Sequence, residues 1–403
     1  KHLITQKRNM RYQPLSSSFY KNARNKFGKL LAQKSLAIFN SNDIYPIGAD
    51  STMPFQQHRD IFYLCGVDQE ESILLLFPDA VEAKHREILF LRETNDHIAV
   101  WEGAKLSKKQ AVQLTGIETI YWLSEFNRVF QELSTQCERF YFNTNEHYRQ
   151  AVETQTREDR FIKWCKKQYP AHGVAKSNPI LQQLRSVKDE EEIAQIQQAC
   201  DITEKGFRRV LSFIKPKVWE YEIEAELIHE FIRNRSRGFA YTPIIAAGNN
   251  ANVLHYTENN QQCKAGDLVL MDVAAEYGNY ASDLTRTVPV SGRFNDRQKA
   301  VYQSVLHVKK EATKLLIPGT IWKEYHIEVG KIMTAIVNLA HNLYSGKCKR
   351  PLVVVPKPTY KKWINEIIGY TDRKTGEFVP GVLSHTGITV NDWFNLGTDV
   401  VEK

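Results

Sequence analysis

The first 175 residues alternate short apolar runs with polar, turn-forming segments. Residues 125–136 repeat their apolar positions with helical spacing and predict a helix. The apolar runs that predict short strands lie within 36–65, 72–80, 87–93 and 139–144. Strands alternating with helical segments are typical of an α/β domain, which we place at residues 1–175. No set of residues in this part clusters as a candidate catalytic site.

Residues 176–330 have the pattern of a second domain with longer amphipathic helices. Ile193, Ile196 and Ala199 recur at helical spacing, and Ser186 with Asp189 predicts a capping box before them. The other elements expected here are a helix over 222–236, a strand within 239–256 and a helix over 297–316.

The stretch LVLMDVAAEYGNYASDLTRT, residues 268–287, is expected to be a hairpin that turns at Tyr277 and Gly278. Pairing about that centre places Asp272 opposite Asp283, with Cβ atoms about 5 Å apart. Asp272 lies in a run that looks buried on both faces, and two facing carboxylates are unfavourable unless a cation lies between them. A water-facing surface hairpin is the alternative. His255, after a Gly-Asn loop, is a candidate hydrogen-bond donor to a developing oxyanion.

The composition and charge are those of an ordinary globular protein. The chain has 403 residues, 42% of them hydrophobic and 25% charged, with a net charge of +8. No apolar run reaches the ~18 residues of a membrane helix, so no membrane partner is expected. Six cysteines without a Cys-x-x-Cys pair suit a reducing cytoplasm. Residues 1–34 hold nine Lys or Arg and no acid, which leaves open a transit peptide or an ordinary basic segment. Met10 is an alternative natural start to Lys1.

Three stretches in order carry a resemblance to a known family. They are RSVKDEEEIAQIQQACDIT, FAYTPIIAAGNNANVLHYTENN and GDLVLMDVAAEYGNYASDLTRT. They resemble the metallopeptidases with the pita-bread fold and, within these, the Xaa-Pro aminopeptidases (aminopeptidase P), over about residues 10–330. The resemblance implies the family's α/β N-terminal domain followed by an α+β pita-bread catalytic domain.

The resemblance also implies a site and a substrate. It implies a dinuclear site, usually manganese, with Asp272 as one ligand and Asp283 as a bridging ligand. His255 would steady the substrate and the tetrahedral intermediate. The substrate would be a peptide with proline at the second position, and a homo-oligomer is expected.

The family's second half, which supplies one histidine and two glutamates as ligands, does not follow in recognisable form. His385 in LSHTGITVND has a poor context, Asn391 stands where a second histidine belongs, and Glu377 comes in the wrong order. His341 lies in an apolar periodic stretch and reads as a helix residue. None is assigned as a ligand, so the pita-bread domain is expected to be incomplete and to bind one metal ion or none.

The stretches GKIMTAIVNLAHNL and RPLVVVPKPTYKKWINEI stand at the start of the tail, residues 331–403. They resemble a short α/β segment of SNF2-like helicases. Ile332 stands where a phosphate loop needs Ser or Thr, so nucleotide binding is not expected. Ten Lys or Arg against six Asp or Glu is too mild an excess to indicate nucleic acid. A chain joined from two unrelated genes is favoured over a divergent second half. An inactive truncated or chimeric protein, or an ATPase fragment, is the functional alternative to a peptidase.

Overall fold

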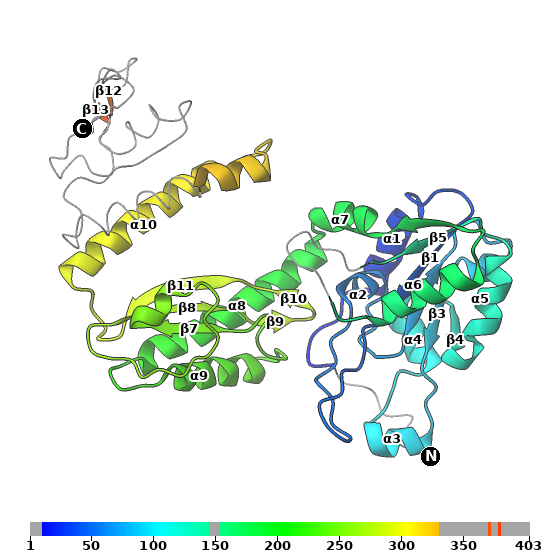
Figure 1. Cartoon of the computed structure of the whole chain (residues 1–403), viewed down its shortest axis with the longest axis horizontal. Helices are drawn as coiled ribbons and strands as arrows, with labels where there is room; N and C mark the ends of the chain where they lie inside the picture. Colours follow the sequence, from blue (N-terminus) through cyan, green and yellow to red (C-terminus); the bar gives the residue numbers. More distant parts are fainter. Residues whose placement is uncertain (1–9, 145–152, 330–369, 372–377, 380–403) are drawn as a thin grey trace, which may run out of the picture. The chain divides into compact units, whose positions relative to one another are not determined.

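A computed structural model describes residues 10–144, 153–329, 370–371 and 378–379. The chain divides into two compact units, residues 1–263 with 269–287 and residues 264–268 with 288–403. Figure 1 labels the helices and strands. The first unit holds both the N-terminal sheet and the aspartate hairpin. The residues His341, Glu377, His385 and Asn391 lie outside the described part of the chain.

The N-terminal part is built on a six-stranded mixed sheet with strand order β4-β3-β2-β1-β5-β6. β1 runs antiparallel to β2 and parallel to β5, whereas β3 is antiparallel to β2 and parallel to β4. The strands are β1 Ser35–Asn40, β2 Ile73–Leu76, β3 Glu87–Leu91, β4 Thr119–Trp122, β5 Arg139–Phe142 and β6 Gly173–Lys176. The predicted α/β class is confirmed.

Helices cover both faces of this sheet, which explains why β1 is buried along its whole length. Ala37 and Phe39 pack into one core with α1, α2, α4 and α7, and Leu36 and Ile38 pack into the other with α5 and α6. The helices are α1 Ser17–Gly28, α2 Arg59–Cys65, α3 Asp96–Glu102, α4 Lys108–Thr115, α5 Phe126–Ser134, α6 Arg157–Gln168 and α7 Asn178–Ser186. Two 3₁₀ turns, η1 Ala83–His85 and η2 Leu123–Glu125, complete this part.

Helix α2 lies inside the range 36–65, where the pattern predicted only short strands and turns. The nitrogen His58 Nδ1 accepts from the Asp60 N–H at 3.2 Å, and Gly66 ends the helix at φ +70°. A Cβ on Gly66 would lie 2.3 Å from the Tyr20 ring. Because α2 is buried from Asp60 to Cys65, it has no polar face to reveal a helical period.

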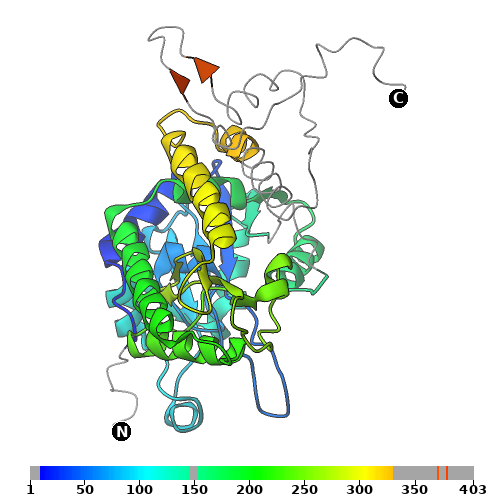
Figure 2. The same cartoon turned by 90° about the vertical axis from the view of Figure 1, so that its left-hand side faces the viewer.

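The part of the chain after α7 contains two long helices and a three-stranded sheet with strand order β11-β8-β7. Helix α8 spans Glu190–Phe213 and packs beside α9, Glu220–Arg233 (Figure 2). Gly206 allows this close approach, because a Cβ there would lie 2.6 Å from the Phe231 ring. The strands are β7 Ile244–Ala247, β8 Leu268–Val273 and β11 Leu284–Pro289.

The cap of α8 differs from the prediction. Asp189, not Ser186, is the N-cap residue, and its box partner is Glu192. Ser186 is the last residue of α7, so it cannot begin the next helix. The second unit contains α10, Asp296–Lys314, and the short antiparallel pair β12 Tyr370–Thr371 and β13 Phe378–Val379.

Candidate metal-binding hairpin

The hairpin after β8 turns one residue later than the sequence predicted. β9, Glu276–Tyr277, pairs with β10, Tyr280–Ala281, so that Tyr277 faces Tyr280. The two loop residues, Gly278 at φ +57° and Asn279 at φ +66°, both have the left-handed conformation that a type I′ turn requires. The predicted pairing of Glu276 with Asn279 is therefore wrong. Asparagine tolerates this conformation well enough to take the second position.

Polar contacts hold the base and the tip of this hairpin. Thr203 Oγ1 on α8 accepts from the Ala275 N–H at 2.8 Å and lies 2.7 Å from Ser282 Oγ. At the tip, Arg237 donates to Asn279 Oδ1 at 2.7 Å. The same guanidinium reaches Asp68 at 2.9 Å, in the N-terminal part of the unit. The hairpin is thus fixed at both ends.

The two aspartates converge on one phenol hydroxyl. Ala240 N–H bonds to Ala274 O at 2.8 Å, which runs the segment before β7 alongside the end of β8. The Tyr241 hydroxyl, on this segment, donates to Asp272 Oδ1 at 2.5 Å and lies 3.2 Å from Asp283 Oδ1. The structure therefore brings Asp272 and Asp283 together, although Asp283 lies between β10 and β11 rather than in a strand.

Asp272 is also more exposed to solvent than the sequence predicted. β8 alternates half-buried and buried residues, so Asp272 is half-buried, not buried on both faces. Asp283 is exposed. The apolar run LVLM looked continuous because Leu268 and Leu270 occupy the half-buried face together with Asp272.

The electrostatics of this cluster favour a cation. Burial, followed by the hydrogen bond to Asp272, raises the pKa of Tyr241, so the phenol stays a neutral donor. Its single proton can bond fully to only one carboxylate at a time, which leaves the other without a positive partner at this point. Carboxylate oxygens are hard donors that suit Mg²⁺, Ca²⁺ or Mn²⁺. The donor set fits a divalent ion, and within the described part of the chain it supplies two protein ligands.

His255 is not joined to this pair by any hydrogen bond or ion pair in the described part of the chain. It lies in an exposed turn just after η3, Gly248–Asn252. The loop that carries it is anchored at its two ends by Glu220, a fully buried carboxylate at the start of α9. Glu220 accepts from the Ala247 N–H at 2.7 Å, the Gln261 N–H at 2.8 Å and the Tyr256 hydroxyl at 2.8 Å.

Comparisons with known proteins agree with this architecture. Residues 20–141 match the model of the aminopeptidase P N-terminal domain, and residues 194–385 match metallopeptidase family M24. The structure of a putative aminopeptidase P from Bacillus anthracis superposes with a TM-score of 0.75 at 28% identity, covering 83% of this chain and 78% of that one. The fold is that of aminopeptidase P.

Curated relatives point to the same fold. The chain is 34% identical over 288 residues to the Xaa-Pro aminopeptidase of Haemophilus influenzae and 32% identical over 288 residues to that of Escherichia coli. These alignments cover 71% of this chain but 64% and 65% of the relatives, so the chain spans less than two thirds of their length. The M24 match extends past the predicted boundary at residue 330. No helix among the described residues is long and apolar enough to cross a membrane.

Within this aminopeptidase P fold, two residues of the candidate site escaped prediction. Tyr241 sits in AYTP, where a bend and a following proline read as an ordinary loop, and nothing marks its hydroxyl as a partner of Asp272. Glu220 reads as one of several acids at a helix start, where acids are common. Only the fold shows that it holds the His255 loop.

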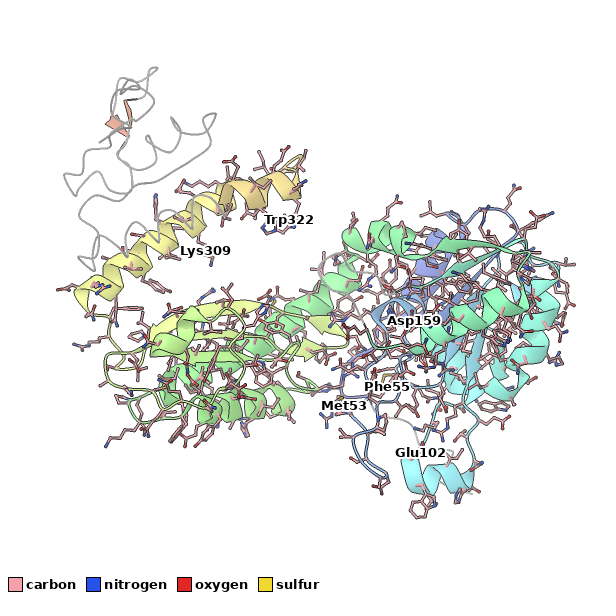
Figure 3. The ribbon with its side chains drawn as sticks, in the orientation of Figure 1. Met53, Phe55, Glu102, Asp159, Lys309 and Trp322 are labelled. Atoms are coloured by element: carbon pink, nitrogen blue, oxygen red, sulfur yellow. The ribbon has the colours of Figure 1, made fainter. Side chains whose placement is uncertain are left out.

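A separate pocket of about 710 Å³ lies in the N-terminal part, by the ends of β1 and β5. Met53 and Phe55 line it together with Asn40, Asn143 and Glu158 (Figure 3). Asp159, labelled beside it, closes the capping box of α6 with Thr156. Tyr241, Asp272 and Asp283 do not line this pocket, so it is distinct from the candidate metal site.

Proposed function

We propose that this protein is a metal-dependent Xaa-Pro aminopeptidase that binds its metal at Asp272 and Asp283. The observation that supports this most is the convergence of both carboxylates on the Tyr241 hydroxyl. The M24 match spans this hairpin, and the similar curated proteins are named Xaa-Pro aminopeptidases. The proposed reaction is removal of the N-terminal residue that precedes proline.

Each residue of the cluster has a role in this proposal. Asp272 and Asp283 would hold the ion, and Tyr241 would keep Asp272 oriented by its hydrogen bond. A bound divalent ion would polarise the scissile carbonyl and make a water a better nucleophile near neutral pH. His255 would donate a hydrogen bond to the carbonyl oxygen as it gains charge, from a loop that Glu220 holds in place.

Manganese is the ion we propose, following the family resemblance, with one ion at this pair. The compartment we propose is the cytoplasm, which agrees with five described cysteines that form no disulfide. A catalytically inactive chain is the second candidate. It is favoured by the departures from the family's context at Glu377, His385 and Asn391.

Hydrolysis of an Xaa-Pro dipeptide by the full chain with added Mn²⁺ tests this proposal. We expect slow, metal-dependent cleavage that Asp283→Asn abolishes and that an Xaa-Ala peptide does not support. Asp201→Asn is the matched control, because the Asp201 carboxylate accepts a bond from Gln197 of the same helix, α8, at 2.7 Å. A wild-type chain without turnover would establish the inactive alternative.

A further inference from the structure

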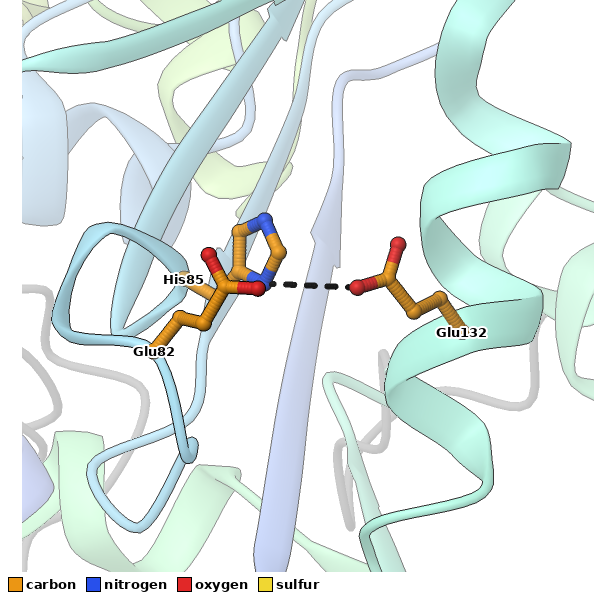
Figure 4. Close-up of side chains that lie close together, drawn as sticks. All are labelled: Glu82, His85 and Glu132. Atoms are coloured by element: carbon orange, nitrogen blue, oxygen red, sulfur yellow. Dashed lines mark ion pairs between the residues drawn. The ribbon is translucent and has the colours of Figure 1, made fainter.

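A second set of candidate metal ligands lies in the N-terminal part, around the 3₁₀ turn η1. Glu82 is the N-cap residue of η1, His85 is its last residue, and Glu132 faces them from α5 (Figure 4). One ligand atom from each residue lies within 4.8 Å of the other two. Among the described residues this is the one set of three or more such groups that satisfies this distance.

The histidine of this cluster is the unusual member. His85 is only 4% exposed, and its Nδ1 atom is buried with no hydrogen-bond partner among the described residues. Its contact with Glu132 Oε1 spans 3.9 Å, which is too long for a hydrogen bond. A buried polar atom without a partner is costly, so this nitrogen needs a proton donor, a water or an ion that the protein atoms do not provide.

We propose that His85, Glu82 and Glu132 form a structural site for a divalent transition metal of the zinc class. One imidazole and two carboxylates are ligands that Zn²⁺ accepts, with a water completing four-coordination. Two ligands of a tetrahedral zinc ion at about 2.1 Å lie roughly 3.4 Å apart. The 3.9 Å between His85 Nδ1 and Glu132 Oε1 is therefore close to the separation of two ligand atoms on one zinc ion. A change of rotamer at the glutamates would bring the ligand atoms to that separation.

Burial and charge decide which side chains can move. The side chains of Glu82 and Glu132 are 52% and 43% exposed, so both can rotate toward a nitrogen that is fixed in the core. Lys84 competes for Glu82 through an ion pair of 2.6 Å. Both members of that pair are exposed, and such pairs add little to stability, so a divalent ion can displace the ammonium. The bound ion would tie the turn before β3 to α5.

Zinc binding to the metal-stripped full chain tests this site, with Asp283→Asn as background to remove the aspartate pair. In competition with a chromophoric chelator, we expect the Asp283→Asn chain to bind one equivalent of Zn²⁺ tightly. Adding Glu132→Gln should weaken it by more than about tenfold, the loss that even outer-shell partners of metal ligands produce. Glu118→Gln, at an exposed acid, should leave it unchanged.

Two further measurements test the same site if one of these variants folds poorly. Co²⁺ bound in the same background should show a ligand-field absorption band that His85→Gln removes. Zn²⁺ should also raise the thermal midpoint of the background chain but not of the Glu132→Gln chain. Equal zinc affinity with and without Glu132, or no tight equivalent in the background, would overturn the proposal and leave His85 satisfied by a proton or a water only.

Discussion

The Tyr241 hydroxyl has one proton and faces two carboxylates, those of Asp272 and Asp283. It can bond fully to only one of them at a time. The hydroxyl bonds at 2.5 Å to Asp272 and reaches Asp283 only at 3.2 Å. Without a metal, the phenol proton is the positive end of the cluster. The sequence identified both aspartates but could not identify Tyr241, because its contact depends on the segment before β7 lying along β8.

Replacing Tyr241 with phenylalanine should destabilise the metal-free chain. The change removes a hydrogen bond to a charged group and leaves two carboxylates facing each other, a loss of about 1 to 2 kcal/mol in the free energy of unfolding. Urea unfolding in the presence of a chelator measures it. Tyr221→Phe is the control, since Tyr221 is an exposed residue of α9. An unchanged unfolding midpoint for Tyr241→Phe would show that the proton contributes nothing.

Glu158 should make stability depend on pH. Burial raises the pKa of its carboxyl to about 7, although Asn40 Nδ2 donates to it at 2.7 Å and the Asn143 N–H at 3.2 Å. The folded state therefore holds this proton more tightly than the unfolded state, whose glutamate has a pKa of about 4.3. The contribution of this group is full below about pH 4 and is lost as pH rises to about 7.

Glu158→Gln should remove roughly 2 to 3 kcal/mol of that decrease between about pH 4.5 and 7. The comparison is between the unfolding free energies of wild-type and variant chains across this range. Glu118→Gln, at an exposed acid, should leave the pH profile unchanged. Parallel profiles for wild type and Glu158→Gln would contradict the raised pKa.

Among the elements, those with a clear period or a strong local signal were predictable and those fixed by tertiary contacts were not. The amphipathic pattern predicted α8, α9 and α10, and the apolar runs predicted β1, β2, β3 and β5. Helix α2 escaped because it is buried on every side. The hairpin register was missed because Gly278 and Asn279, rather than Tyr277 and Gly278, form its turn.

The loop from β7 to residue 261 is expected to depend on Glu220. Glutamine there would place an amide NH₂ group among donors that include the N–H groups of Ala247 and Gln261. We expect Glu220→Gln to cost roughly 3 kcal/mol of unfolding free energy and to speed hydrogen exchange of this loop. Glu204→Gln, at an exposed ion pair on α8, is the control. Unchanged exchange in the loop would show that Glu220 does not hold it.

The second unit has four exposed apolar residues close together in the sequence, between positions 316 and 322. Leu316, Ile317, Ile321 and Trp322 are 49%, 64%, 57% and 63% exposed. Scattered exposed apolar residues are ordinary, but a contiguous group marks an interaction site or an aggregation risk. The homo-oligomer expected from the sequence would be one way to cover it.

The full chain should therefore self-associate as its concentration rises. Light scattering behind size exclusion should give a mass above that of one chain, and Ile317→Ser with Trp322→Ser should lower it. Lys309→Gln on α10 provides a control, because it changes an exposed polar residue of the same unit. A monodisperse single chain at every concentration would contradict this expectation.

We propose above that Asp272 and Asp283 bind a divalent metal ion. Isothermal titration of the metal-stripped chain with Mn²⁺ tests it most directly, in a His85→Gln background that disables the second proposed site. We predict one equivalent bound by this chain and an affinity more than about tenfold weaker after Asp283→Asn. Equal Mn²⁺ binding before and after Asp283→Asn would contradict the claim.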